Sequence, residues 1–230
     1  LWQQVAGLGW CGVHLPEPGG GLGRGLAERC VLAEALGRHL APVPWFETAV
    51  LAGQALAASA GATGAAGGAP LLAAWLQGLA EGRCRATLSF GDDGPRWTNR
   101  HAALQATTTA AGWQLDGLSA PLPGAAVADL WLLTASTAQG EALLLGVPRD
   151  AAGASVQPVA NHDLTRPLAR VRLVGVAVPG PACLARGPAV DGLLQAVQQR
   201  AAIVLAAEQV GVAQRSLDLA VAYTGERVQF

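Results

Sequence analysis

The pattern of hydrophobic residues changes twice along this chain, near Arg83 and again near Gly187. Before Arg83, apolar residues recur at three- and four-residue steps, most clearly over Leu26–Leu40, which is the spacing of one helix face. Between the two points the apolar segments are short and are separated by Gly, Pro, Asp and Asn, as strands are. After Gly187 the helical pattern returns. The order helix, strand, helix predicts an α+β fold.

The middle of the chain contains the expected strands. Because no helical pattern lies between them, we expect an antiparallel barrel or sandwich rather than a parallel sheet with crossover helices. In the last of these strands Val171 and Leu173 should face inward, and Arg170 and Arg172 outward. The expected strands are Ala86–Phe90, Trp113–Asp116, Asp129–Ala135, Ala142–Val147 and Leu168–Val178.

The helical segments define the rest of the organisation. We expect a helical N-terminal domain over 1–84, a β-domain over 85–180, and the first helix of a C-terminal helical bundle over 188–230. The expected helices are Leu26–Leu40, Thr48–Ser59, Leu71–Leu79 and Asp191–Tyr223. The last is rich in small residues that permit close helix approach, so we expect other helices or subunits to cover one of its faces.

Composition excludes several classes of protein. Hydrophobic residues make up 51% of the 230 residues and charged residues 13%, which suggests a surface partly covered by partners. A net charge of −1 argues against nucleic-acid binding, and no apolar run is long enough for a membrane span.

Four scattered cysteines without a C-x-x-C motif predict free thiols in a cytosolic protein. All 15 basic residues are Arg, which indicates a GC-rich, bacterial genome and hence a bacterial cytoplasmic location.

Common catalytic motifs are missing from the sequence. No histidine is paired with another His or Cys at metal-ligand spacing, so we expect no metal site. No nucleophile elbow and no Cys–His arrangement is found. The glycine-rich segment 19–25 does not have the G-x-G-x-x-G spacing of a phosphate loop and is interpreted as a turn between helices.

The end of the chain carries the strongest functional candidates, Arg227, Gln229 and Phe230. A guanidinium offers paired donors and a fixed charge to a diphosphate. An amide can hold a neighbouring oxygen, and an aromatic ring can cover a nucleoside or a flavin. Taken by itself, however, Arg227 is better interpreted as a solvated cation at a helix C-terminus, where the helix dipole favours it.

Five segments in order, followed by the Arg-x-Gln-Phe at 227–230, resemble the acyl-CoA dehydrogenase family. Each match is weak alone, but their common order along nearly the whole chain is specific. The segments are 10–23 (WCGVHLPEPGGGLG), 32–44 (LAEALGRHLAPVP), 112–117 (GWQLDG), 166–179 (RPLARVRLVGVAVP) and 207–220 (AEQVGVAQRSLDLA).

The resemblance implies an FAD-dependent α,β-dehydrogenation of an acyl-CoA thioester, with electrons passed to an electron-transfer flavoprotein. It implies a homo- or hetero-oligomer, dimeric or tetrameric, in which Arg227 and Gln229 reach across a subunit interface to the FAD diphosphate. Arg200 lies near the family's basic residue for the CoA moiety. The family usually places its catalytic glutamate, and several more helices, after the position of Phe230. We therefore assign no catalytic residue and expect the chain to be truncated before those helices.

Two segments depart from the family pattern. Residues 88–96 (LSFGDDGPR) replace the family's Thr-Glu-Pro-x-Ala-Gly-Ser-Asp, and either Phe90 and Gly91 line the flavin or the segment is a plain hairpin turn. Further on, Pro123 matches the family, but Ser119 and Pro121 replace its Lys and aromatic residue. These changes keep open a second interpretation, a non-catalytic partner subunit of a heteromeric dehydrogenase that contributes to its partner's FAD site.

Overall fold

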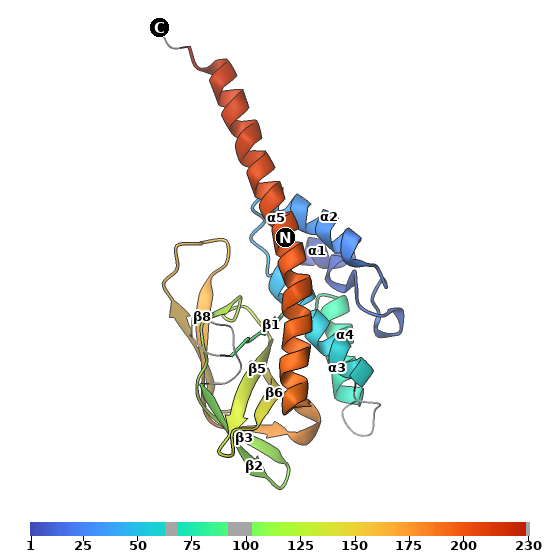
Figure 1. The fold of residues 1–230 in the computed structure, drawn as a ribbon, viewed down its shortest axis with the longest axis vertical. Helices are drawn as coiled ribbons and strands as arrows, with labels where there is room; N and C mark the ends of the chain where they lie inside the picture. The colour runs from blue at the N-terminus through green and yellow to red at the C-terminus, as the bar shows by residue number, and fades with distance from the viewer. Residues whose placement is uncertain (63–68, 92–102, 229–230) are drawn as a thin grey trace.

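The computed structural model describes residues 1–62, 69–91 and 103–228. Helices come first, strands follow, and one long helix, α5, ends the chain (Figure 1). The β-sheet and the N-terminal helices lie on opposite sides of the first half of α5, whereas the C-terminal end of α5, past its contacts with α2, projects beyond both (Figure 1). In the described part of the chain no helix combines the length and the hydropathy needed to cross a bilayer.

Local signals in the sequence set the ends of the helices. The Gly25 N–H donates to the Glu28 carboxylate at 2.9 Å and so begins α2, while a proline begins α5. The expected helix over 48–59 is observed as a buried π-helix, η3, which continues into α3. The helices are α1 Trp2–Gly7, η1 Trp10–Gly12, η2 Glu17–Gly19, α2 Leu26–Arg38, η3 Phe46–Ala52, α3 Gly53–Ala62, α4 Ala69–Ala80, η5 Gly180–Ala182 and α5 Pro188–Glu226.

The strands of the described residues form one nine-stranded sheet, ordered β4-β8-β3-β2-β5-β6-β9, with β1 on β5 and β7 on β8. Val171 and Leu173 are buried as expected and Arg172 is exposed, while Arg170 is partly buried. The strands are β1 Ala86–Leu88, β2 Leu104–Thr109, β3 Gly112–Leu118, β4 Leu122–Pro123, β5 Leu130–Thr137, β6 Ala142–Pro148, β7 Ala154–Val159, β8 Leu168–Pro179 and β9 Cys183–Arg186.

The predicted α+β order is confirmed, but the sheet is mixed rather than antiparallel throughout. β1 and β2 both pair with β5 in parallel, while the other pairings are antiparallel. Tight turns force neighbouring strands such as β2–β3 and β5–β6 to run antiparallel, but they place no such constraint on strands far apart in sequence. As a division into domains, the boundaries 1–84, 85–180 and 188–230 remain predictions.

Two glycines allow α2 and α5 to touch backbone to backbone. A Cβ on Gly37 would lie 2.1 Å from the Glu208 carbonyl oxygen, and a Cβ on Gly211 would lie 2.0 Å from the Glu34 carbonyl oxygen. Neither neighbour is a flexible side chain, so a larger residue must push the helices apart. These two residues therefore determine the position of α5 against α2. They also determine where α5 lies relative to the other elements that it contacts.

We predict that Gly211→Ala lowers the free energy of unfolding by at least about 2 kcal/mol, because the added methyl overlaps backbone atoms. Gly192→Ala on the same helix is the matched control: a Cβ there meets nothing within 4 Å. This control should raise stability by about 0.5–1 kcal/mol through helix propensity. Urea unfolding measures both variants, and equal effects at the two positions would contradict the close crossing.

Candidate functional site

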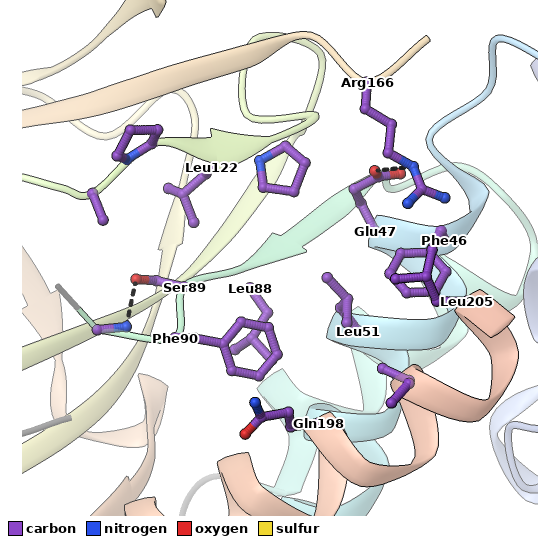
Figure 2. Close-up of a pocket in the computed structure, with 16 residues that line it drawn as sticks. Phe46, Glu47, Leu51, Leu88, Ser89, Phe90, Leu122, Arg166, Gln198 and Leu205 are labelled. Carbon is purple, nitrogen blue, oxygen red and sulfur yellow. Dashed lines mark hydrogen bonds and ion pairs between the residues drawn. The ribbon is translucent and has the colours of Figure 1, made fainter. Parts of the chain in front are cut away.

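A cavity of about 540 Å³ lies where η3, the end of β1, the region around β4 and the first half of α5 meet (Figure 2). Its walls are mainly apolar, with a few polar groups at the margins. The lining residues are Phe46, Glu47, Leu51, Leu88, Ser89, Phe90, Gly91, Ala120, Pro121, Leu122, Pro123, Arg166, Gln198, Ala201, Ala202 and Leu205. A largely apolar cavity with a few fixed polar groups is the usual form of a small-molecule site.

Hydrogen bonds from the sheet fix the wall formed by the end of β1. The Ser89 N–H donates to the Leu132 carbonyl at 2.8 Å, and the Ser89 hydroxyl lies 3.3 Å from that of Thr134. The Gly91 N–H in turn donates to the Ser89 hydroxyl at 3.4 Å (Figure 2). Gly91 has φ of 118°, a conformation that side chains disfavour. This segment therefore presents backbone and the Phe90 ring to the cavity.

One arginine closes the opposite end of the cavity. Arg166 Nε lies 3.7 Å from Glu47 Oε1, while Nη2 of the same guanidinium is ion-paired with Glu208 on α5. The guanidinium also stacks on Phe46, 4.5 Å from the ring centroid. Figure 2 shows Arg166 and Glu47 together, away from Ser89 and Phe90. Arg166 thus connects η3, the segment before β8 and α5 at the edge of the cavity.

Glu47 is an unusual group to find in such a wall, because only 3% of its surface is exposed. Burial raises the pKa of the Glu47 carboxyl, the positive charge of Arg166 opposes that rise, and the negative charges of Glu208 and Asp163 add to it. Its contact with Arg166 is longer than a hydrogen bond, so this pair is held by charge, while a backbone hydrogen bond to the Glu47 carboxyl also opposes the rise of its pKa. In its protonated form it offers the cavity a hydrogen-bond donor.

The structure brings three of the predicted cofactor residues together, since Phe90, Gly91 and Pro123 all line the cavity. Arg227 is exposed at the far end of α5, where its guanidinium donates to the Tyr223 hydroxyl at 2.8 Å. It follows Gln198, a lining residue, by 29 positions, which is about 43 Å along a helix. Arg200 is exposed and lies outside the set of lining residues. Gln229 and Phe230 lie outside the described residues.

Comparison with known proteins gives one consistent result. Residues 1–83 match the family model described as acyl-CoA dehydrogenase, N-terminal domain. The chain is 29% identical over 231 residues to the acyl-CoA dehydrogenase FadE27 of Mycobacterium tuberculosis, a match that covers the whole chain and 57% of FadE27. The chain is thus similar to the acyl-CoA dehydrogenase family, through its first 83 residues to the N-terminal domain and over its whole length to individual members. It spans about half the length of the curated relatives it matches.

Two solved structures match the whole chain. One is described as the Tcur3481-Tcur3483 steroid ACAD G363A variant, with 33% identity, a TM-score of 0.79 and 58% of its chain covered. The other is the ChsE4-ChsE5 complex from Mycobacterium tuberculosis, with 26% identity, a TM-score of 0.81 and 58% covered. The helix, sheet and helix order of this chain is therefore the fold of the family.

Sequence reasoning missed Glu47, Arg166 and Gln198, all of which line the cavity. A signal for Glu47 was available, because it is a lone charge in an apolar stretch of helix. The separation of Glu47 and Arg166 by 119 positions hid their pairing. Part of the glycine–aspartate turn, residues 92–96, lies outside the described residues, so its predicted role stays a prediction.

We predict that Arg166→Met lowers the free energy of unfolding by about 2–4 kcal/mol, because it leaves Glu47 and Glu208 without their shared cation. The loss of unfolding free energy should lie toward the low end of this range, because the Arg166 side chain keeps 23% of its surface exposed. Arg172→Met on β8 is the matched control, since Arg172 is exposed. A loss no larger than that of the control, measured by urea unfolding, would show that Arg166 does not hold the three segments together.

The raised pKa of Glu47 also predicts a pH dependence. Because the folded state holds this proton more tightly than the unfolded state, the contribution of Glu47 to stability is present below its unfolded pKa and is lost as pH rises through the folded pKa. The stability of Glu47→Gln relative to wild type should therefore increase as pH rises from about 4.5. Glu141→Gln should show an effect of opposite sign at lower pH. Because hydrogen bonds from Arg186 lower the pKa of Glu141, this variant should gain stability relative to wild type as pH falls from about 4.5. Denaturant unfolding above and below this pH tests both signs.

Proposed function

We propose that this chain is a subunit of an FAD-dependent acyl-CoA dehydrogenase that oxidises the Cα–Cβ bond of a bulky acyl-CoA thioester. The observation that carries the proposal is the apolar cavity, whose wall contains Phe90, Gly91 and Pro123. When bound, FAD supplies the acceptor for the substrate's β-hydride. The chain's own residues bind and orient the reactants and exclude water.

The cavity residues fit a flat, largely apolar ring system. The Phe90 ring and the backbone around Gly91 form one wall, and Pro121 and Pro123 belong to another. Pro121 has no N–H to offer. The Ser119 hydroxyl donates to the Ala120 carbonyl at 2.7 Å and accepts from the Val171 N–H at 2.9 Å. These groups can hold a flavin ring by contact, with few hydrogen bonds from the segment around β4.

The cavity does not fit a diphosphate. Its one described lining cation, Arg166, is already ion-paired with Glu47 and Glu208. A diphosphate therefore needs a cation from elsewhere, and Arg227 is suited to it by chemistry. The length of α5 keeps Arg227 about 43 Å from Gln198 along the helix, so we infer that it serves the FAD of a neighbouring subunit.

The size of the cavity and its apolar walls favour a bulky acyl group. We infer a steroid-sized substrate, in agreement with the description of the relative with 33% identity as a steroid ACAD. Gln198 and the protonated form of Glu47 can hydrogen-bond to a polar group on such a substrate. An electron-transfer flavoprotein is the inferred acceptor of the electrons.

The second half of α5 supports an oligomer. Several large apolar residues there are more than half exposed, namely Val210, Leu217, Leu219, Val221 and Tyr223. A helix with apolar residues normally packs them against a neighbour. A relative is described as the ChsE4-ChsE5 complex, which agrees with an assembly of two different chains. We infer that neighbouring helices or subunits cover this half of α5.

A non-catalytic partner subunit is the second candidate. It is favoured by the cavity wall around Ser119 and Pro121, which offers a flavin few hydrogen bonds. Among the described lining residues the single carboxyl is that of Glu47, and Arg166 is paired with it. In this case the chain lends Arg227 to a partner that carries out the chemistry.

The test is flavin retention by the purified complex of this chain with a family member whose flavin motifs are intact. Arg227→Ala should weaken FAD binding roughly ten- to hundredfold, because a charge-assisted contact is lost. Arg215→Ala, an exposed arginine on the same helix, is the control and should leave the flavin absorbance unchanged. Equal occupancy in all three proteins would reject the role of Arg227. A stable yellow protein from this chain alone would reject the partner-subunit alternative.

A further inference from the structure

The buried polar atoms that lack a hydrogen-bond partner gather on few residues. In the part of the chain that the structure describes they are both ring nitrogens of His14, Nε and Nη1 of Arg29, and Oε1 of Gln54. Such atoms are rare in folded proteins, because each loses its contact with water without gaining another. Their concentration on a histidine and an arginine indicates a site rather than unrelated local defects in packing.

Three segments bring these groups together beside α5. Arg29 lies on α2, which packs along α5, and keeps only 7% of its surface exposed. His14 follows η1, and its Cε1 lies 3.2 Å from the position that a Cβ on Gly53 would take. Arg200 lies on α5, and its positive charge acts on both His14 and Arg29. Since Arg200 is exposed, the cluster reaches the solvent.

The charges in this cluster are not compensated. Within the described residues Arg29 forms no ion pair, and the guanidinium of Arg200 acts on it with the same sign. Arg166 provides the contrast, because two carboxylates flank it at a similar position against α5. Burial and the two arginines lower the pKa of His14 to about 3, so the ring is neutral at pH 7 and keeps an N–H to donate. A buried guanidinium beside a second cation calls for an anion.

We propose that His14, Arg29 and Arg200 form a binding site for an oxyanion, a carboxylate or phosphate group that enters beside Arg200. Two guanidiniums and an imidazole are the donors that such groups prefer. A water molecule could satisfy the hydrogen bonds but would leave both positive charges in place. The oxyanion is either a free ion or the carboxylate of a protein segment packed over α5. None of the three residues lines the large cavity, so the site is separate from that cavity.

The first test measures the melting temperature of the purified protein in sodium phosphate and in sodium acetate, against sodium chloride of equal ionic strength. A free oxyanion at about 100 times its Kd should raise the melting temperature by roughly 5–10 °C. Arg29→Met should abolish this rise while melting no lower than wild type in chloride, because it removes an unpaired buried charge. Arg200→Gln, at an exposed position, should reduce the rise severalfold. Arg24→Gln, an exposed arginine on the loop before α2, is the control and should keep it.

The second test separates the two sources of the oxyanion. If free ions have no effect on the wild-type protein, sedimentation measures how tightly this chain associates with its partner chain. Weaker association of Arg29→Met and Arg200→Gln, but not of Arg24→Gln, identifies a carboxylate of the covering chain. An equal ion effect in wild type and Arg29→Met overturns the proposal. The proposal is also overturned if ions have no effect and the variants associate as wild type does. In that case only bound water would be left to satisfy the buried polar atoms.

Discussion

The arrangement of this protein depends on a single arginine at the meeting point of three segments. Arg166 precedes β8, faces Glu47 on η3, is ion-paired with Glu208 on α5 and stacks on Phe46. Without this cation two carboxylates would share a poorly solvated region and repel each other. The sheet, the N-terminal helices and α5 would then lose their common contact at the edge of the cavity. The same charge that joins the segments thus also shapes the end of the candidate site.

The sequence predicted the order of the elements because their periodicities differ, and α5 in particular was clear from its length. It did not predict β2 and β7, because Thr, Gln and exposed positions hide alternation in segments such as Leu104–Thr109. It also missed the two parallel pairings of β5, since direction between distant strands is set by the tertiary fold. Hydrophobic pattern is local information, and these features are not local.

The candidate site, too, could be predicted from the sequence only in part. Phe90, Gly91 and Pro123 were found through resemblance to a family, and the structure places them on one cavity. Glu47 and Arg166 were missed, because nothing in their neighbouring residues shows that they meet. The cluster of His14, Arg29 and Arg200 was equally hidden, since it joins a loop, α2 and α5. Residue type indicates chemistry, but only packing shows which charges are already neutralised.

Whether an arginine near α5 can bind a ligand anion depends on whether a carboxylate already neutralises its charge. Arg166 has two carboxylates and so has little attraction left for a ligand anion. Arg29 has no such partner among the described residues, and Arg200 adds to its charge. Arg227, beyond the end of α5, is too far along the helix to serve the cavity of its own chain. Arginines placed at different points along α5 can each meet a different anion, so this arrangement is suited to joining subunits.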